Sequence, residues 1–210
     1  MAIELDIQKN FKGFSLDVRL KGQDGPIGIL GASGSGKSMT LRSIAGIETP
    51  DSGRIIINGK TVFDSEAKIN LKPQERRVGY LFQNYALFPT MTVEKNIACG
   101  YRGEKSELSQ KVADYIKRYH LEGLEKHLPS QLSGGQQQRT LLARALCAAS
   151  KVILLDEPVT GLDPKVTAEF YQVTKDLSEE GIAVIMVSHD VQALDYATHI
   201  LHMQKKNSFY

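Results

Sequence analysis

Residues 31–38 constrain this chain more than any other segment. They read GASGSGKS, follow the apolar run 27–30 and precede a helix-like segment, 39–45. Because glycine lacks a Cβ atom, the backbone N–H groups of such a loop can turn inward around an anion. A helix starting near Lys37 would direct the positive end of its dipole toward the same anion. Strand, glycine-rich loop and helix in this order predict a phosphate-binding loop.

Lys37 and Ser38 supply the side chains that this loop needs for chemistry. The Lys37 ammonium can reach the terminal phosphates of a nucleotide, and the Ser38 hydroxyl can ligate Mg²⁺. A flexible loop without a ligand is the alternative, and the flanking strand and helix argue against it. We expect these residues to bind the nucleotide, with Lys37 also catalytic: Gly31, Ala32, Ser33, Gly34, Ser35, Gly36, Lys37, Ser38 and Met39.

Segments with strand-like patterns occur on both sides of this loop. Alternation of apolar and polar residues predicts half-buried antiparallel strands at 3–7 and 14–20. The sequence Asn58-Gly59 predicts the tight turn of a hairpin formed by 54–57 and 60–63. Residues 64–75 are polar and predict an exposed loop. Runs that are apolar throughout predict strands of a buried parallel sheet, namely 78–82, 152–155 and 182–187, and a last strand is expected at 199–203.

Helical patterns dominate residues 92–149. One helix there would carry its apolar face on Leu108, Val112, Tyr115, Ile116 and Tyr119, with Ser106 as its N-cap. A second amphipathic helix is expected from Asp163-Pro164, with Asp163 as the cap and Pro164 in the first turn. Its apolar stripe would be Val166, Phe170, Val173 and Leu177, and a short helix is expected after His189. Strands alternating with helices predict an α/β sheet that binds ligands at the carboxyl ends of its strands.

Asp156 and Glu157 follow the apolar run 152–155. A buried strand would place them at the carboxyl edge of the sheet, beside the phosphate-binding loop. One carboxylate there can hold Mg²⁺, and the next can accept a proton from an attacking water. Acids often end strands without any catalytic role, but the loop in the same chain favours chemistry. We expect Asp156 to bind the metal and Glu157 to be the catalytic base.

A further motif, LSGGQ, occupies residues 132–136 before a helix that runs through Arg144. Small residues before a helix start can form a second anion-binding N-terminus, although alone they would favour a turn with Ser133 as the N-cap. Together, LSGGQ, GASGSGKS and VILLDEP resemble the ATP-binding subunit of ABC transporters. The resemblance covers almost the whole chain.

The resemblance implies roles for residues that the patterns alone do not assign. Gln83 matches the Q-loop glutamine, a catalytic residue and metal ligand, and His189 matches the catalytic switch histidine. Asp163 lies in the D-loop, which contacts the opposite subunit and its nucleotide. Phe11 lies where the family keeps an aromatic ring that stacks on adenine, although Phe11 and the nearby Phe14 could both be core residues. Nucleotide contacts are also implied for Ser133, Gly135 and Gln136.

The resemblance also implies a fold and its subdivision. We expect one ABC ATPase domain over residues 1–210, of α/β class, with a RecA-like P-loop NTPase core built on a mainly parallel sheet. The core would comprise 1–83 and 151–210 and include an antiparallel β subdomain. An inserted helical subdomain, 84–150, would carry the LSGGQ motif.

In the family, ATP and Mg²⁺ lie between two subunits arranged head to tail, so the resemblance implies a homodimer. Membrane permease subunits would contact the groove near residues 83–89, and an external solute-binding protein would act indirectly. The protein would be cytoplasmic and peripheral on the inner face of the cell membrane. Nucleic acid is not expected as a partner, because the net charge is only +2.

Residues 75–89 indicate the class of solute, because they resemble the same segment in importers of molybdate, sulfate, sugars and polyamines. The short insert 64–71 looks most like molybdate ATPases, so import of an oxyanion such as molybdate is expected, with the other solutes as alternatives. Such importers usually continue into a β-rich regulatory domain. This sequence ends about twenty residues after His189, so we expect either a short form or a piece of a longer protein. An ABC-type ATPase acting on nucleic acid or ribosomes, and a small-molecule P-loop kinase, rank below the transporter hypothesis.

Composition excludes some other classes of protein. No apolar run approaches the ~20 residues of a membrane-spanning helix. The chain has two cysteines, Cys99 and Cys147, in no metal-binding or redox spacing. They are expected to be reduced thiols in the core.

Overall fold

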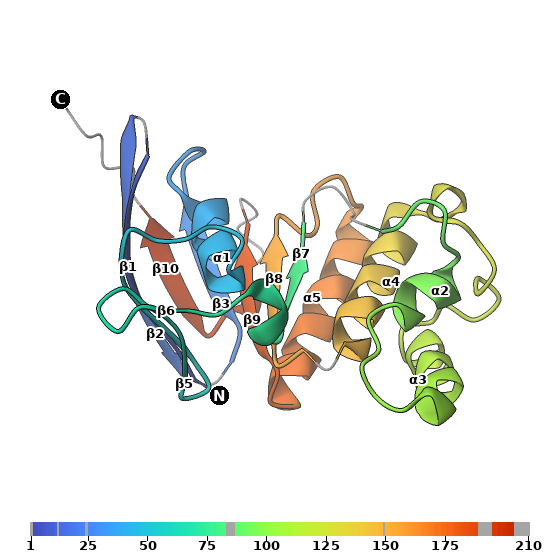
Figure 1. The fold of residues 1–210 in the computed structure, drawn as a ribbon. Coiled ribbons are helices and arrows are strands. Elements are labelled where there is room, and N and C mark those ends of the chain that lie inside the picture. The colour runs from blue at the N-terminus through green and yellow to red at the C-terminus, as the bar shows by residue number, and fades with distance from the viewer. Residues whose placement is uncertain are drawn as a thin grey trace.

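A computed structural model describes residues 2–11, 13–23, 25–82, 87–148, 150–188 and 195–203. The strands of these residues form two sheets, one antiparallel and one parallel, with helices packed around the parallel sheet (Figure 1). The α/β class and the order of elements agree with the prediction. The expected short helix after His189 lies outside the described residues, as do residues 83–86. The subdomain boundaries therefore stay a prediction.

The antiparallel sheet has the order β2-β1-β4-β5-β6. Leu5 of β1 pairs with Leu20 of β2 on one side and with Ile55 of β4 on the other. The predicted hairpin is confirmed: Asn58, between β4 and β5, has the positive φ of 51° that a tight turn of this kind requires. The strands are β1 (Ala2–Phe11), β2 (Phe14–Gln23), β4 (Ser52–Ile57), β5 (Lys60–Asp64) and β6 (Ile69–Asn70).

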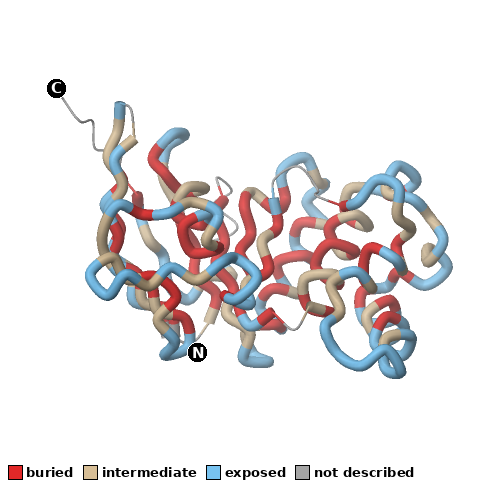
Figure 2. Tube along the Cα trace, in the orientation of Figure 1, coloured by how far each residue is buried: buried red, intermediate tan, exposed pale blue. Residues whose placement is uncertain are grey.

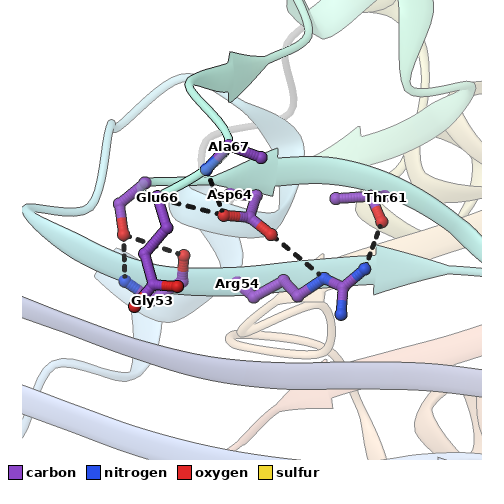
Figure 3. A network of polar contacts seen from close by, with 7 residues as sticks. Gly53, Arg54, Thr61, Asp64, Glu66 and Ala67 are labelled. Carbon is purple, nitrogen blue, oxygen red and sulfur yellow. Dashed lines mark hydrogen bonds and ion pairs between the residues drawn. The ribbon is translucent and has the colours of Figure 1, made fainter.

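The segment 64–75 is not simply an exposed loop, and that prediction was wrong. It contains β6, which pairs with β5, and the 3₁₀ helix η1 (Pro73–Glu75). A polar network holds the turn between the strands (Figure 3): Asp64 Oδ1 accepts the backbone N–H groups of Glu66 and Ala67 at 3.0 and 2.9 Å. Arg54 bridges Asp64 and Thr61 in the same network. Local side-chain hydrogen bonds thus order a segment whose composition resembles a loop.

The parallel sheet has the order β10-β3-β9-β8-β7. β8 is buried at every position, as expected for a strand covered on both faces. Because all these strands run in the same direction, the end of β3 and the end of β8 lie at one edge of the sheet. The strands are β3 (Ile27–Gly31), β7 (Val78–Leu81), β8 (Val152–Asp156), β9 (Ala183–Val187) and β10 (His199–Met203).

The helices are α1 (Lys37–Ala45), α2 (Val93–Ala98), α3 (Lys105–Arg118), α4 (Gly134–Cys147) and α5 (Pro164–Glu179), with a 3₁₀ turn, η2 (Pro129–Gln131). Asp163 caps α5 as predicted. The prediction that Ser106 caps α3 was wrong, because Glu104 is the last extended residue before α3 and Ser106 already lies in its first turn. The predicted apolar face of α3 is confirmed, with Val112, Ile116 and Tyr119 buried.

The parallel sheet separates two hydrophobic cores. Successive residues of a strand point to opposite faces, and β8 shows the division: Leu154 belongs to the core that contains α1 and the antiparallel sheet. Ile153 and Leu155 belong to the core that contains α4 and α5. Figure 2 shows the buried residues along the strands and the inward sides of the helices. The phosphate-binding loop and the LSGGQ motif therefore begin helices on opposite faces of one sheet.

Candidate functional site

The loop between β3 and α1 has the shape that its sequence predicts. Gly36 is the N-cap of α1 with φ 98°, and a Cβ atom there would lie 2.6 Å from Leu16 Cδ1. A side chain at this position would have to displace the end of the Leu16 side chain, and it would be strained because φ 98° lies in the left-handed region that glycine adopts freely. Ala32, Ser33 and Gly34 at the tip are exposed. The loop tip, just before the start of α1, is thus open to an anion.

Lys37 folds back over this loop and is only 6% exposed. Its Nζ donates to the carbonyl oxygens of Gly31 and Ala32 at 2.7 and 3.1 Å. Burial lowers the pKa of Lys37, whereas the charges of Glu157 and Asp156 act in the opposite direction. An ammonium has three donors, so the two carbonyls hold the lysine in place and leave a donor for a phosphate.

The Asp156 carboxylate receives a hydrogen bond on each oxygen. Ser38 Oγ donates to Oδ1 at 2.8 Å, and the Tyr80 hydroxyl donates to Oδ2 at 2.7 Å. Burial first, and the hydrogen bond to Asp156 second, raise the pKa of Tyr80, while Arg42 opposes this shift. The expected partnership of Ser38 and Asp156 is therefore present in the fold, and Tyr80 is a site residue that the sequence patterns did not predict.

The oxygens of Ser38 and Asp156 are suitable ligands for Mg²⁺, which prefers hard oxygen donors. Among the described residues, no group of three or more His, Cys, Asp or Glu side chains could hold a metal ion. Mg²⁺ commonly binds through one or two protein oxygens together with substrate phosphates, rather than in a protein cage. The pair beside the phosphate-binding loop fits that mode.

Glu157 directly follows β8 and has φ 52°. This left-handed conformation is uncommon for a residue with a long side chain. Its backbone N–H donates to Val187 O of β9 at 3.0 Å. Neighbouring strands therefore hold Glu157 in an unfavourable backbone conformation at the carboxyl edge, as often occurs at functional sites.

The LSGGQ motif forms the start of α4. Ser133 is exposed and caps the helix, accepting the Gln136 N–H at 3.3 Å, while Gln136 Oε1 accepts the Ser133 N–H at 2.9 Å. This is a complete capping box. A Cβ atom on Gly135 would lie 2.7 Å from Val166 Cγ1 of α5. Glycine at this position therefore allows α4 to approach α5 closely.

Asp163 has the contacts of a helix cap, and Phe11 has the contacts of a packed aromatic residue. Asp163 Oδ1 accepts the N–H groups of Lys165 and Val166 at 3.0 and 3.1 Å, so it caps α5, and it is exposed. The Phe11 ring stacks on Phe14, with centroids 4.8 Å apart. Phe14 in turn adjoins Gly36, since a Cβ atom there would lie 3.3 Å from Phe14 Cε2. This aromatic pair lies beside the phosphate-binding loop.

Comparison with models of known protein families assigns the chain to a family. The family model described as ABC transporter matches residues 12–160, which is more than half of the sequence. The chain belongs to the ABC transporter family. The match includes the phosphate-binding loop, Asp156, Glu157 and the LSGGQ motif.

Curated relatives of this ABC family chain are named for the import of sulfate/thiosulfate or of molybdenum. The sulfate/thiosulfate import ATP-binding protein CysA of Thermosynechococcus vestitus is 44% identical over 85% of this chain and 53% of its own length. CysA of Pseudomonas aeruginosa is 41% identical over 98% of this chain and 64% of its own length. The molybdenum import ATP-binding protein ModC of Paramagnetospirillum magneticum is 36% identical over 90% and 53%. The chain thus spans about half to two thirds of the length of these relatives.

Solved structures of ATP-binding cassettes share the fold. A dimeric cassette in a post-hydrolysis state, bound to ADP and Pi, is 29% identical with a TM-score of 0.80, covering 99% of this chain and 98% of that chain. The cbiO1 protein of Clostridium perfringens, part of the ABC transporter complex cbiONQ, is 26% identical with a TM-score of 0.83, covering 96% and 84%. The predicted ABC ATPase fold is confirmed.

Some residues expected for this family lie outside the described part of the chain. Gln83 and His189 are among them, so their predicted roles stay predictions. Of the segment expected to contact a permease, Leu87 is buried and Phe88 is 47% exposed. Among the described residues, no helix has both the length and the apolar character to cross a bilayer.

Proposed function

We propose that this chain binds and hydrolyses ATP with Mg²⁺, as the ATPase subunit of an importer whose membrane subunits are separate chains. The observation that carries the proposal is the hydrogen bond of 2.8 Å between Ser38 and Asp156. It joins the phosphate-binding loop to the end of β8, where a nucleotide phosphate and a cation would meet.

Each residue of this site has a distinct role in the proposed reaction. Lys37 and the N–H groups at the start of α1 bind the β- and γ-phosphates. Ser38 and Asp156 hold Mg²⁺, which supplies positive charge for the phosphoryl group when bound. Glu157 orients and deprotonates the attacking water. His189 and Gln83 are proposed to complete the site from segments outside the described residues.

The second half of each site is proposed to come from another copy of the chain. The exposed Ser133 begins α4, and α4 and α1 pack on opposite faces of the parallel sheet. A head-to-tail dimer would bring Ser133, Gly135 and Gln136 of one copy to the nucleotide of the other, with Asp163 at the contact. The dimeric form of a cassette with the same fold supports a dimer.

A tetrahedral oxyanion is the proposed solute. The relatives named for sulfate/thiosulfate import are 41% and 44% identical, and the one named for molybdenum import is 36% identical. We therefore propose sulfate as the first candidate solute and molybdate as the second, although the insert 64–71 alone favoured molybdate. The permease is proposed to dock near residues 83–89, at the inner face of the cell membrane, with a solute-binding protein outside.

Phosphate release from ATP tests the proposed activity, with Lys37→Ala as the informative variant. Removing the ammonium that contacts the terminal phosphates should abolish tight ATP binding and hydrolysis. Lys175→Ala, which removes an exposed lysine of α5, is the matched control and should hydrolyse ATP normally. Normal turnover by Lys37→Ala would exclude the phosphate-binding loop from the mechanism.

Solute uptake tests the oxyanion assignment. Cells from which this gene has been deleted are complemented with the wild-type gene or with Lys37→Ala, and uptake of radiolabelled sulfate and molybdate is measured. We expect the wild type, but not the variant, to restore sulfate uptake. Restoration of molybdate uptake alone would reverse the order proposed above, and restoration of neither would reject both oxyanions.

A further inference from the structure

We propose that Tyr80 is a positioning residue for the Asp156 carboxylate and thereby sets the affinity of the site for Mg²⁺. This inference rests on the proposed function, because it concerns the same carboxylate. The starting observation is the hydrogen bond of 2.7 Å from the Tyr80 hydroxyl to Asp156 Oδ2. Tyr80 belongs to none of the motifs that identify the site.

The pairing of β7 with β8 explains how Tyr80 reaches the carboxylate. Tyr80 is paired with Leu154, and Asp156 follows two residues later in β8. Because side chains alternate across a strand, Tyr80, Leu154 and Asp156 face the same side of the sheet. A phenol is long enough to extend from its own register position to the next residue on that face, so the hydroxyl meets the carboxylate at the end of β8.

Ser38 and Tyr80 hold different oxygens of the carboxylate. Ser38 donates to Oδ1 and Tyr80 to Oδ2. A hydroxyl has one donor and two lone pairs, so Ser38 can keep its bond to Asp156 while a lone pair faces a cation. Tyr80 fixes the other oxygen from the side of the sheet. With both oxygens engaged, the carboxylate is prevented from rotating, and its remaining lone pairs would stay available to a cation.

Hydrogen bonds to a metal-binding carboxylate from outside the ligand set commonly tune metal affinity. The alternative is that Tyr80 only fills space, with its ring against Phe82 at a centroid distance of 4.3 Å. Phenylalanine would make that ring contact equally well. The two explanations therefore differ in the hydroxyl alone.

Tyr80→Phe is the variant that separates these explanations. We would load the protein with the non-hydrolysable analogue AMP-PNP and titrate it with Mn²⁺, following the free ion by its paramagnetic resonance signal. Loss of the hydroxyl should weaken Mn²⁺ binding by about 10- to 100-fold. Affinity for AMP-PNP in EDTA should stay within about twofold of wild type, because the phosphate-binding loop is intact. The Mg²⁺ concentration for half-maximal ATP hydrolysis should rise in parallel.

Tyr115→Phe is the matched control. Its hydroxyl donates to the Leu146 carbonyl at 3.2 Å between α3 and α4, away from the carboxylate. It removes the same atom and should leave Mn²⁺ affinity unchanged. Wild-type Mn²⁺ affinity in Tyr80→Phe would overturn the inference. So would an equal loss of AMP-PNP affinity in EDTA, because that loss indicates general disruption of the site.

The result for the wild-type protein separates this inference from the proposed function. If the wild type binds AMP-PNP and Mn²⁺ and hydrolyses ATP, the proposed function stands whatever Tyr80→Phe does. If the wild type binds neither, the proposed function fails, and the role of Tyr80 in metal binding fails with it.

Discussion

Glu157 and Lys37 are in unfavourable settings at the scale of single residues, Glu157 in its backbone conformation and Lys37 in its burial. Glu157 has φ 52° directly after a buried strand, and Lys37 is a nearly buried ammonium over backbone carbonyls. Such a backbone conformation costs of order 1–3 kcal/mol, and proteins retain it where the surrounding structure imposes it. Both residues lie at the same edge of the parallel sheet, where the proposed reaction takes place.

Glu157→Gln should separate nucleotide binding from hydrolysis. The amide keeps the size of the side chain but cannot accept a proton, so hydrolysis should slow by about 10²-fold or more while ATP affinity stays near wild type. Phosphate release and ATP titration measure the two effects, and gel filtration should show a dimer that accumulates with ATP and Mg²⁺.

Glu169→Gln, on the exposed side of α5, is the control for Glu157→Gln and should leave both quantities unchanged. Wild-type turnover in Glu157→Gln would exclude Glu157 as the base and make His189 the next candidate.

Arg76 illustrates how a whole element is held in place. The guanidinium is 3% exposed and donates to Ser43 O and Ile44 O at the end of α1, at 2.7 and 3.0 Å. It also donates to Leu71 O and Asn70 Oδ1, both at 2.9 Å. Burial lowers the pKa of Arg76. The last carbonyl groups of a helix lack partners within the helix, and Arg76 donates to two of them while joining α1 to β6.

Arg76→Met should destabilise the fold by about 3 kcal/mol, because hydrogen bonds to a charged group contribute roughly 1.5–3 kcal/mol and buried acceptors lose their partners. Urea unfolding measures the loss. Arg77→Met is a close control, since Arg77 is the next residue and its side chain is exposed. Equal stabilities of the two variants would show that Arg76 does not anchor α1.

At the scale of the whole molecule, the phosphate-binding loop and the LSGGQ motif precede helices that pack on opposite faces of the parallel sheet. The parallel sheet lies between the helix that follows the phosphate-binding loop and the helix that follows Ser133 (Figure 1). In the proposed dimer, each copy completes the site of the other. An exposed Ser133 with an intact capping box is a ready anion-binding helix start for that purpose.

Mixing two inactive variants tests this arrangement. Lys37→Ala disables the phosphate-binding loop, and Ser133→Arg places a bulky side chain at the start of α4. If the motif acts in trans, the mixed dimer contains one intact site, and mixing should restore part of the ATPase activity. If the motif acts in cis, every site carries a defect and the mixture stays inactive.

A dimer that requires two intact sites would stay inactive in the mixing experiment even if the motif acts in trans. Crosslinking tests the arrangement without relying on activity. Ser33→Cys and Ser133→Cys are combined in a Cys99→Ser background, because Cys99 is the exposed native thiol among the described residues. An ATP-dependent crosslink between chains supports the head-to-tail dimer. Absence of both the crosslink and recovered activity would contradict it.

Local features of this protein could be predicted from its sequence. The phosphate-binding loop, the Asn58-Gly59 hairpin and the Asp163 cap depend on neighbouring residues, so their patterns are readable without tertiary structure. The family resemblance added the fold and the expected site. Two incorrect assignments, residues 64–75 and the Ser106 cap, concern segments where several local hydrogen-bond arrangements compete. The expectation that both cysteines lie in the core was also wrong for Cys99, which is exposed at the C-terminal end of α2, whereas Cys147 is buried as expected.

Only the tertiary structure decided which distant residues meet. The strand order β10-β3-β9-β8-β7 places the end of β8 near Ser38, and the pairing of β7 with β8 brings Tyr80 to Asp156. The same holds for Arg76, whose four partners belong to α1 and to the segment of β6. Periodicity specifies which face of an element is apolar, but not which element will cover it. The contacts that complete the site therefore depend on how the sheet is assembled.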